Sequence, residues 1–450
     1  QGLRSDGTGD GYWNIVNYID GANVNDGLIS PDRIPQPETH EFKKIIQNIR
    51  VWKLSEGKLR INNLNFFTDL KNVKMDWEVI RNGYPVRSGS VEELNVNPRD
   101  SAEVSIPVSG DLLQQDGEYF LNLVFRTKTD LPYAAKGFDL ASEQILLKSQ
   151  TLSVPAAGVS GKPLQVLEGD IITIKGKEIS ISVDKATGSI ISYVFRGSEL
   201  VSDPLQPCFW RVPTDNDEGG GNGGFAARWR KAGLDRYSVR VRNLGFSTQD
   251  NGDVVMDVAS DLVFVGEKTM DYKGSSTFRT DGSIVFAMDL NLPDGFPPLA
   301  RVGMQFAMPA SYDYIKWNGR GPFESYQDRK ESAHVGLWSG AVSDQYFPYV
   351  MHQENGNKTD VRWLKITDDA ATGLKITGTP LMEVNVQNYS QQALNLAKPS
   401  KRLFRGDKTY INIDLKQMGL GGDDSWSPRV HEEYQLKEKS YRFGFVISPM

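Results

Sequence analysis

The fold of the middle of this chain is decided by residues 119–125, which read YFLNLVF. Apolar side chains at every second position, from Tyr119 to Phe125, share one face of an extended strand. Upstream, Leu59–Phe67 and Met75–Arg81 have the same strand-like pattern. Asn82-Gly83 then predicts a hairpin, because both central residues of a type I′ turn need a positive φ. This pattern predicts a β-sandwich of about one hundred residues.

Short strands also fill the rest of the chain beyond residues 154–164, which have the Pro- and Gly-rich composition of a linker. No long helix separates these strands, so we expect a large antiparallel sandwich rather than a parallel α/β sheet. The fold class is therefore mainly β. The predicted strands are Ile171–Ile174, Ile179–Val183, Ile190–Phe195, Val254–Val258, Ile284–Leu290 and Tyr441–Ile447.

The first 47 residues follow a different pattern. They are rich in Gly, Asn and Asp, and then become helical where Phe42, Ile45, Ile46 and Ile49 recur at helical spacing. A free-standing domain does not usually begin with some forty residues of loop. We therefore divide the chain into residues 1–47, a sandwich over 48–153, a linker over 154–164 and a large domain over 165–450.

Composition excludes several classes of protein. The net charge of −6 is thinly spread and the basic residues form no stripe, which argues against a nucleic-acid partner. No apolar stretch is long enough to cross a membrane. Residues 1–20 lack the layout of a secretion signal, which leaves open that such a signal has already been removed. Cys208 is the single cysteine, so neither an internal disulfide nor a thiolate zinc site is expected. The oligomeric state, including a homo-oligomer, is left open.

The acidic run over residues 211–218 (RVPTDNDE) offers Asp215 and Asp217 as oxygen ligands for a metal. The spacing of a calcium loop fails after the second acid, so a polar turn is the alternative. The histidines are isolated, without a metal-binding or catalytic motif, and are expected to be surface or satisfied interior residues. They are His40, His334, His352 and His431.

Residues 419–428, GLGGDDSWSP, combine a flexible backbone with two acids and an indole. Such a loop suits sugar recognition, because a pyranose ring stacks on Trp426 while carboxylates accept hydrogen bonds from its hydroxyl groups. The alternative is that Trp426 fills a local core and Asp423 or Asp424 caps a turn. The residue types alone leave both interpretations open.

Four motifs, in the same order along the chain, resemble the C-terminal half of the glycoside hydrolase family 2 β-galactosidases. They are Arg211–Asp217 with Arg228–Gly233, Asn318–Arg329, Pro348–Val350 with Gln353–Gly356, and the closing segment with Tyr389–Gln392, Tyr410–Asp414 and Gly419–Pro428. Leu28–Arg33, with Pro35, Pro37 and the helix after them, is similar to the end of that family's catalytic barrel. The resemblance implies a remnant of a TIM barrel, an immunoglobulin-like sandwich and a large sandwich of the galactose mutarotase type.

The resemblance also implies roles for individual residues. Trp426 matches the tryptophan that reaches the mouth of the active site, and Asp20 falls on an active-site carboxylate position. Asp26 stands where the family usually has an Asn near a sodium site, and Asn23 where an aromatic is usual, which puts that site in doubt. The catalytic glutamates belong to barrel strands that would precede Gln1, so no catalytic residue is assigned here.

We therefore expect a fragment of a retaining exo-β-galactosidase that supplies sugar-binding wall and scaffold but is inactive alone. Its partners would be a β-galactoside and the rest of the barrel. Magnesium, and as a second metal sodium, would be bound in the complete enzyme and not in this chain. A carbohydrate-binding small subunit that complements a separate barrel chain is the alternative. A mutarotase-like epimerase would need a His and Glu pair that no motif here supplies. The resemblance points to a periplasmic location.

Overall fold

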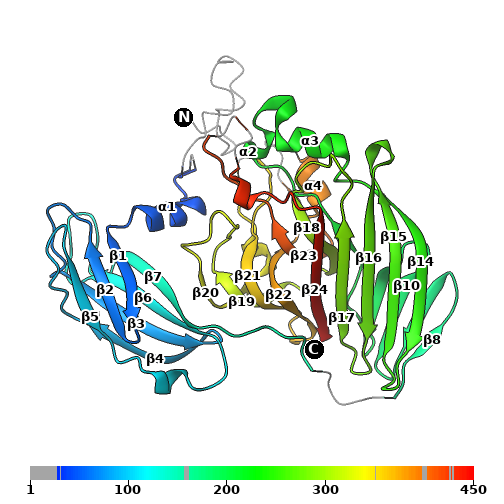
Figure 1. Ribbon diagram of the computed structural model, residues 1–450, viewed down its shortest axis with the longest axis horizontal. Coiled ribbons are helices and arrows are strands. Elements are labelled where there is room, and N and C mark those ends of the chain that lie inside the picture. Colours follow the sequence, from blue (N-terminus) through cyan, green and yellow to red (C-terminus); the bar gives the residue numbers. More distant parts are fainter. Residues whose placement is uncertain are drawn as a thin grey trace. The chain divides into compact units, whose positions relative to one another are not determined.

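The structure is a computed structural model that describes residues 28–30, 32–156, 162–349, 351–397, 403–424, 427 and 430–450. The chain divides into two compact units, each built mainly from antiparallel strands (Figure 1). The sandwich unit comprises Pro35–Thr151 and the short segment Glu331–Leu337. The large unit comprises the described residues up to Ile34, together with Leu152–Lys330 and Trp338–Met450.

The sandwich unit consists of two antiparallel sheets. Its elements are α1 (Glu38–Ile46), β1 (Ile49–Ser55), β2 (Lys58–Asn63), β3 (Val73–Arg81), β4 (Tyr84–Val91), β5 (Ser101–Ser105), η2 (Gly110–Leu113), β6 (Tyr119–Thr127) and β7 (Asp139–Lys148). One sheet has the order β1-β2-β5 and the other β4-β3-β6-β7. The alternating residues of β6, from Tyr119 to Phe125, are buried as predicted and share a core with Val79 of β3.

The hairpin predicted at Asn82-Gly83 is confirmed. The two residues have φ values of 50° and 85°, and Arg81 pairs with Tyr84 across the turn. Both central residues adopt the left-handed conformation that this hairpin requires, which explains why Asn and Gly stand there.

The strand predicted over Leu59–Phe67 is too long, because β2 ends at Asn63. The side-chain amide of Asn63 donates to the carbonyl of Thr68 (2.8 Å) and its oxygen accepts from the backbone N–H of Asn65 (3.0 Å). These local bonds replace the strand ladder. Phe67 beyond them is 96% exposed.

The helix predicted before the sandwich forms as α1, but its apolar side chains are not the ones that the unit buries. Glu41 is buried, and its carboxylate accepts hydrogen bonds from the backbone N–H groups of Glu331 (3.1 Å) and Ser332 (2.9 Å). The exposed apolar residues of the helix are Phe42, Ile45 and Ile46. Charged groups therefore hold α1 within its unit, and an apolar face remains exposed.

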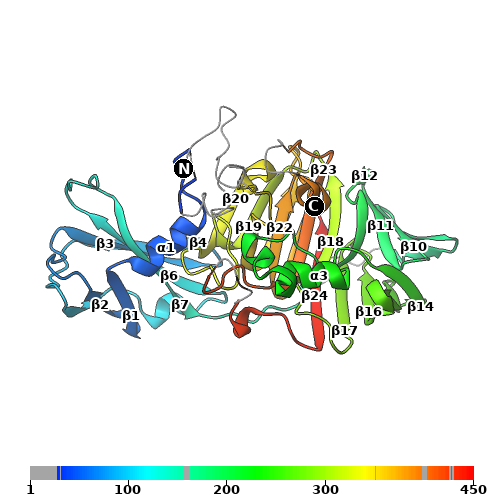
Figure 2. The ribbon, with the colours of Figure 1, turned by 90° about the horizontal axis from the view of Figure 1, so that it is seen from above.

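The large unit is a single curled antiparallel sheet system that closes on itself. Its strands are β8 (Gln165–Leu167), β9 (Ile171–Lys175), β10 (Ile179–Asp184), β11 (Ser189–Phe195), β12 (Ser198–Glu199), β13 (Asp203–Cys208), β14 (Ser238–Thr248), β15 (Val254–Val263), β16 (Thr269–Phe278), β17 (Ile284–Asn291), β18 (Arg301–Pro309), β19 (Tyr314–Gly321), β20 (His334–Ala341, whose first residues belong to the sandwich unit), β21 (Lys358–Thr367), β22 (Gly373–Gln387), β23 (Lys408–Gln417) and β24 (Ser440–Pro449). Figures 1 and 2 show β10 beside β14 and β16. The strands predicted in this region all form, and the mainly β fold class is confirmed.

The helices of the large unit are short. They are α2 (Asp215–Glu218), η3 (Gly221–Gly223), α3 (Phe225–Ala232), η4 (Val265–Glu267), η5 (Val342–Gln345), α4 (Gln391–Leu396) and η6 (Glu432–Tyr434). Figure 1 shows α2, α3 and α4 near one end of the strands. Sequence patterns missed α3, which buries Phe225 and Trp229 and ends at Gly233 in the left-handed conformation. Within the described residues, no helix has both the length and the hydropathy to span a bilayer.

Candidate functional site

A buried ion pair lies at the centre of the candidate site. Arg211 follows β13, and its guanidinium contacts both carboxylate oxygens of Asp217 at 2.7 and 3.0 Å, with neither side chain exposed. Burial alone lowers the pKa of Arg211, but the neighbouring carboxylate outweighs this effect and holds that pKa above its ordinary value. A buried charge needs such a partner, so this pair is fixed.

The chain places Asp217 opposite Arg211 by forming a single helical turn. Thr214 caps α2: its hydroxyl accepts from the backbone N–H of Asp217 (3.3 Å), and Asp217 accepts from the backbone N–H of Thr214 (2.9 Å). This reciprocal arrangement is a capping box. Asp217 therefore both starts the helix and neutralises the arginine.

The same arginine also holds a distant loop. Its Nη1 and Nη2 groups donate to the carbonyl oxygens of Met418 and of Gly419 (3.0 Å). Next to them, Asn216 donates from Nδ2 to the carbonyl of Leu420 (2.9 Å). Residues 211–217 thus bind three successive carbonyl groups of the loop that follows β23.

Asp328 fixes the loop from the other side. Its Oδ2 accepts from the backbone N–H of Gly421 (2.7 Å). Gly419 lies so close that a Cβ atom there would come 2.6 Å from the same oxygen, so a larger residue would displace the carboxylate of Asp328. The backbone N–H of Gly419 donates to the carbonyl of Tyr434 (3.0 Å). We call residues 418–421, held in this way, the anchored loop.

Two further contacts connect the remaining motif. Glu324 is buried, and its carboxylate accepts from the hydroxyl of Tyr349 (2.8 Å) and the backbone N–H of Gly356 (2.6 Å). The backbone N–H of Glu354 donates to the carbonyl of Val212 (3.0 Å). The four motifs that lie far apart in the sequence are therefore joined by direct hydrogen bonds within one unit.

Of the residues proposed for the site, the structure describes Asp215 and Asp217. Asp215 is exposed at the start of α2, and Asp217 is committed to Arg211 and Thr214, which does not fit a metal ligand. In the described ranges, no group of three or more His, Cys, Asp or Glu residues is placed to hold a metal ion. Trp426, Asp20 and Asp26 lie outside the described residues.

Of the residues near Trp426 in the sequence, Asp423, Asp424 and Ser427 are described. Asp424 accepts hydrogen bonds from the backbone N–H (2.8 Å) and hydroxyl (2.7 Å) of Ser427. His431 lies 2.9 Å from Asp423, and this hydrogen bond raises the pKa of the exposed imidazole. Sequence reasoning assigned no role to Arg211, Asn216 or Asp328. Their place in the motifs was visible, but their partners were not.

The comparisons with known proteins agree on one family. The family described as "Beta galactosidase small chain" matches residues 175–447, more than half of the chain, and "Beta-galactosidase, domain 4" matches residues 59–148. The β-galactosidase of Priestia megaterium is 33% identical over 439 residues, covering 96% of this chain and 41% of the relative. That of Vibrio cholerae serotype O1 is 31% identical and covers 99% of this chain and 44% of the relative.

Among solved structures, galactose 1-epimerase from Lactobacillus acidophilus NCFM superposes on 62% of this chain and 94% of its own, with a TM-score of 0.33 and 7% identity, too weak a likeness to carry an argument. The chain spans less than half the length of the two curated relatives named above. The family matches cover both described units. The chain therefore belongs to the β-galactosidase family, of which it represents a C-terminal portion with the small-chain domain at residues 175–447.

Proposed function

We propose that this chain is part of a retaining exo-β-galactosidase that hydrolyses terminal β-D-galactosides, and that it forms one wall of the sugar site. The observation that carries the proposal is the anchored loop, which leads directly into the segment with Trp426. Arg211, Asn216 and Asp328 bind its backbone at consecutive residues. A side chain that stacks on a sugar needs such a rigid support.

In this proposal the catalytic carboxylates lie outside this chain. Glu324, Glu354 and Glu383 are buried, and each already accepts hydrogen bonds from the protein. The exposed apolar face of α1 is consistent with a barrel that packs against it in the complete enzyme, because apolar side chains on one helix face favour a packing partner. Magnesium, and sodium in the second place, would be held by the complete enzyme through residues outside this chain.

The first test is an assay of the 450-residue chain with an aryl β-galactoside. We expect no turnover, because the proposal places both glutamates of the double displacement elsewhere. Turnover that survives stringent purification and is lost on replacing a glutamate of this chain would contradict the proposal.

The second test replaces Trp426 in the complete enzyme. Trp426→Ala should weaken the binding of substrate or acceptor by about 1–3 kcal/mol, the scale of a lost aromatic contact. Trp52→Ala, at a half-exposed position of β1 in the sandwich unit, is the matched control and should leave the Michaelis constant unchanged. An unchanged Michaelis constant and acceptor preference in Trp426→Ala would refute the role of this residue.

A further inference from the structure

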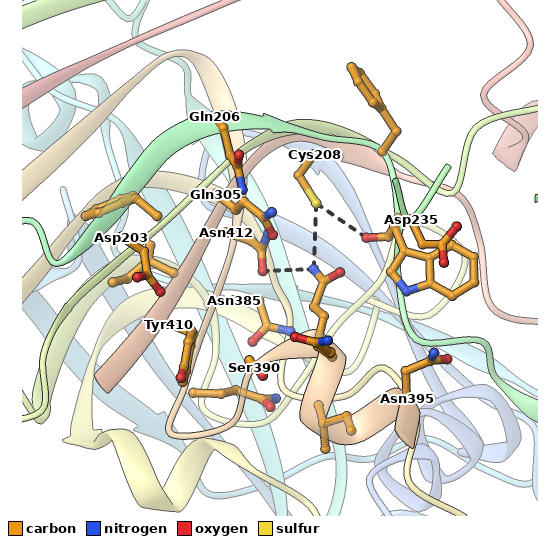
Figure 3. A pocket seen from close by; sticks show the side chains of 18 of the residues that line it. Asp203, Gln206, Cys208, Asp235, Gln305, Asn385, Ser390, Asn395, Tyr410 and Asn412 are labelled. Atoms are coloured by element: carbon orange, nitrogen blue, oxygen red, sulfur yellow. Dashed lines mark hydrogen bonds between the residues drawn. The ribbon is translucent and has the colours of Figure 1, made fainter. Parts of the chain in front are cut away.

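Four neighbouring strands of the large unit present one row of amide side chains. In the register of β22, β23, β18 and β13, Asn385 pairs with Asn412, Asn412 with Gln305, and Gln305 with Gln206. Each strand therefore contributes one amide at the same level. Figure 3 shows Gln206, Gln305 and Asn412 one behind another.

The opposite face of these strands is apolar and belongs to the core. Because side chains alternate between faces, residues adjacent to the amides point away from them. These residues include Val384, Val386, Met304 and Ile413, all buried in the main core cluster. The core therefore packs against the apolar face of these strands, and the polar face with the amides is not needed for that core.

That polar face is the floor of a cavity of about 620 Å³. This volume lies within the range of small-molecule sites, roughly 300–1,000 Å³. Aromatic side chains also line it, namely Trp210, Tyr237, Tyr389 and Tyr410. We call this cavity the amide cavity; among the described residues, no member of the anchored loop contributes to its lining.

Some of the amides are fixed while others keep their hydrogen-bonding capacity. Asn385 donates from Nδ2 to Glu354 Oε1 (2.7 Å) and to the carbonyl of Asn355 (2.7 Å). Within the described part of the chain, the side-chain amides of Gln206 and Gln305 form no hydrogen bond. Each of these free amides offers both donors and an acceptor to a ligand.

The charges around the cavity are compensated. Asp203 lies 2.6 Å from Lys408, and Asp235 lies 3.1 Å from Arg236. Glu354 also has a buried cation nearby, since Arg301 is 3.6 Å away. A ligand with a net charge would therefore find its counter-charges already paired. A neutral molecule with many hydroxyl groups could form hydrogen bonds with the amides of Gln206 and Gln305.

We propose that the amide cavity binds a neutral carbohydrate of the size of a mono- or disaccharide. The amides match hydroxyl groups, which both donate and accept, and the aromatic rings match the apolar face of a pyranose. The test below changes glutamines of this cavity and leaves Trp426 in place, so its outcome is distinguishable from that of the proposed function.

The experiment is a titration of the 450-residue chain with D-galactose, lactose and cellobiose, followed by calorimetry and ligand-observed NMR. We expect millimolar or tighter binding of at least one sugar. The double variant Gln206→Ala with Gln305→Leu should weaken it by about tenfold or more, because two hydrogen-bonding groups are lost. Gln249→Ala, at an exposed glutamine outside the cavity, is the matched control and should bind as the parent does.

Melting curves show whether the double variant folds. If it does not, Gln206→Ala alone replaces it, since Gln206 is exposed and a truncation there leaves the core intact. Absence of binding for all three sugars would overturn the proposal. Binding that the folded glutamine variants leave unchanged, or tighter binding of D-galacturonate than of D-galactose, would overturn it as well.

Discussion

Arg211 and Asp217 form a pair from which water is excluded, and Arg211 also binds the carbonyl of Gly419. A buried pair adds little stability over apolar residues of the same shape, but breaking it leaves an uncompensated charge. The role of this pair is therefore to fix positions, because it holds the residues after β13 next to the loop after β23.

Asp217→Ala should lower the free energy of unfolding by about 3–5 kcal/mol, because Arg211 then stays buried without its counter-charge. The neighbouring Glu218→Ala removes an exposed pair with Arg230 and should cost less than about 1 kcal/mol. Urea unfolding of both variants measures the difference. Equal losses would mean that the buried pair has no special role.

Glu383 offers a test by pH. Burial raises its pKa to about 7, although hydrogen bonds from Gln327 (2.5 Å) and Asn357 (2.8 Å) oppose the shift. Because the folded pKa exceeds the unfolded value of 4.5, the folded state binds the proton more tightly. The stability from this proton is complete below about pH 4.5 and is lost as the pH rises through about 7.

Glu383→Gln should remove this dependence. Relative to that variant, the parent chain should lose up to about 3 kcal/mol of unfolding free energy between pH 4.5 and 7.5, at about 1.4 kcal/mol per unit of pKa shift. Glu168→Gln, at an exposed position, is the matched control. The check is urea unfolding across this pH range, and parallel curves for parent and Glu383→Gln would contradict the expectation.

At the scale of the element, β18 lies between β13 and β23 and makes room for a buried carboxylate. Gly303 pairs with Asp414 of β23, and a Cβ atom at Gly303 would overlap the Oδ1 atom of Asp414 and the carbonyl oxygen of Ile413. The missing side chain lets the two strands keep their register.

Gly303→Ala should destabilise the large unit by about 1–3 kcal/mol, since an added methyl group in a packed interior forces strands apart. Gly245→Ala in β14 is the control, because a Cβ atom there meets open space, and it should stay within about 0.5 kcal/mol of the parent. Denaturant midpoints compare the two. A tolerated Gly303→Ala would show that β18 can shift without cost.

Several elements were predictable because their signals are local. The alternation in β6 and the Asn82-Gly83 turn depend only on neighbouring residues and on backbone geometry, and both predictions are confirmed. The early end of β2 was not predictable, because the Asn63 side chain competes with the ladder through bonds that appear only in the folded loop.

At the scale of the whole molecule, the two units have separate cores. Leu123 belongs to the core of the sandwich unit and Ile413 to that of the large unit, and none of the described residues is common to both. Each core can therefore be weakened by itself.

We expect two separable unfolding transitions in calorimetry. Leu123→Ala should lower one of them and Ile413→Ala the other, each by about 2–5 kcal/mol, the cost of a large-to-small change in a core. Hydrogen exchange assigns each transition to its unit. If both variants shift a single shared transition, the two units unfold as one.

Strand periodicity, the main turn and the ordered motifs follow from the order of residues alone, as does, through the resemblance, the family that the comparisons confirm. Which polar residues face inwards depends on how distant segments pack together. Arg211 and Gly419 are 208 positions apart, and the four amides of the cavity become neighbours only through strand register. The physical reason is that side-chain periodicity is a property of the local backbone, whereas partners across a sheet depend on how distant strands pair.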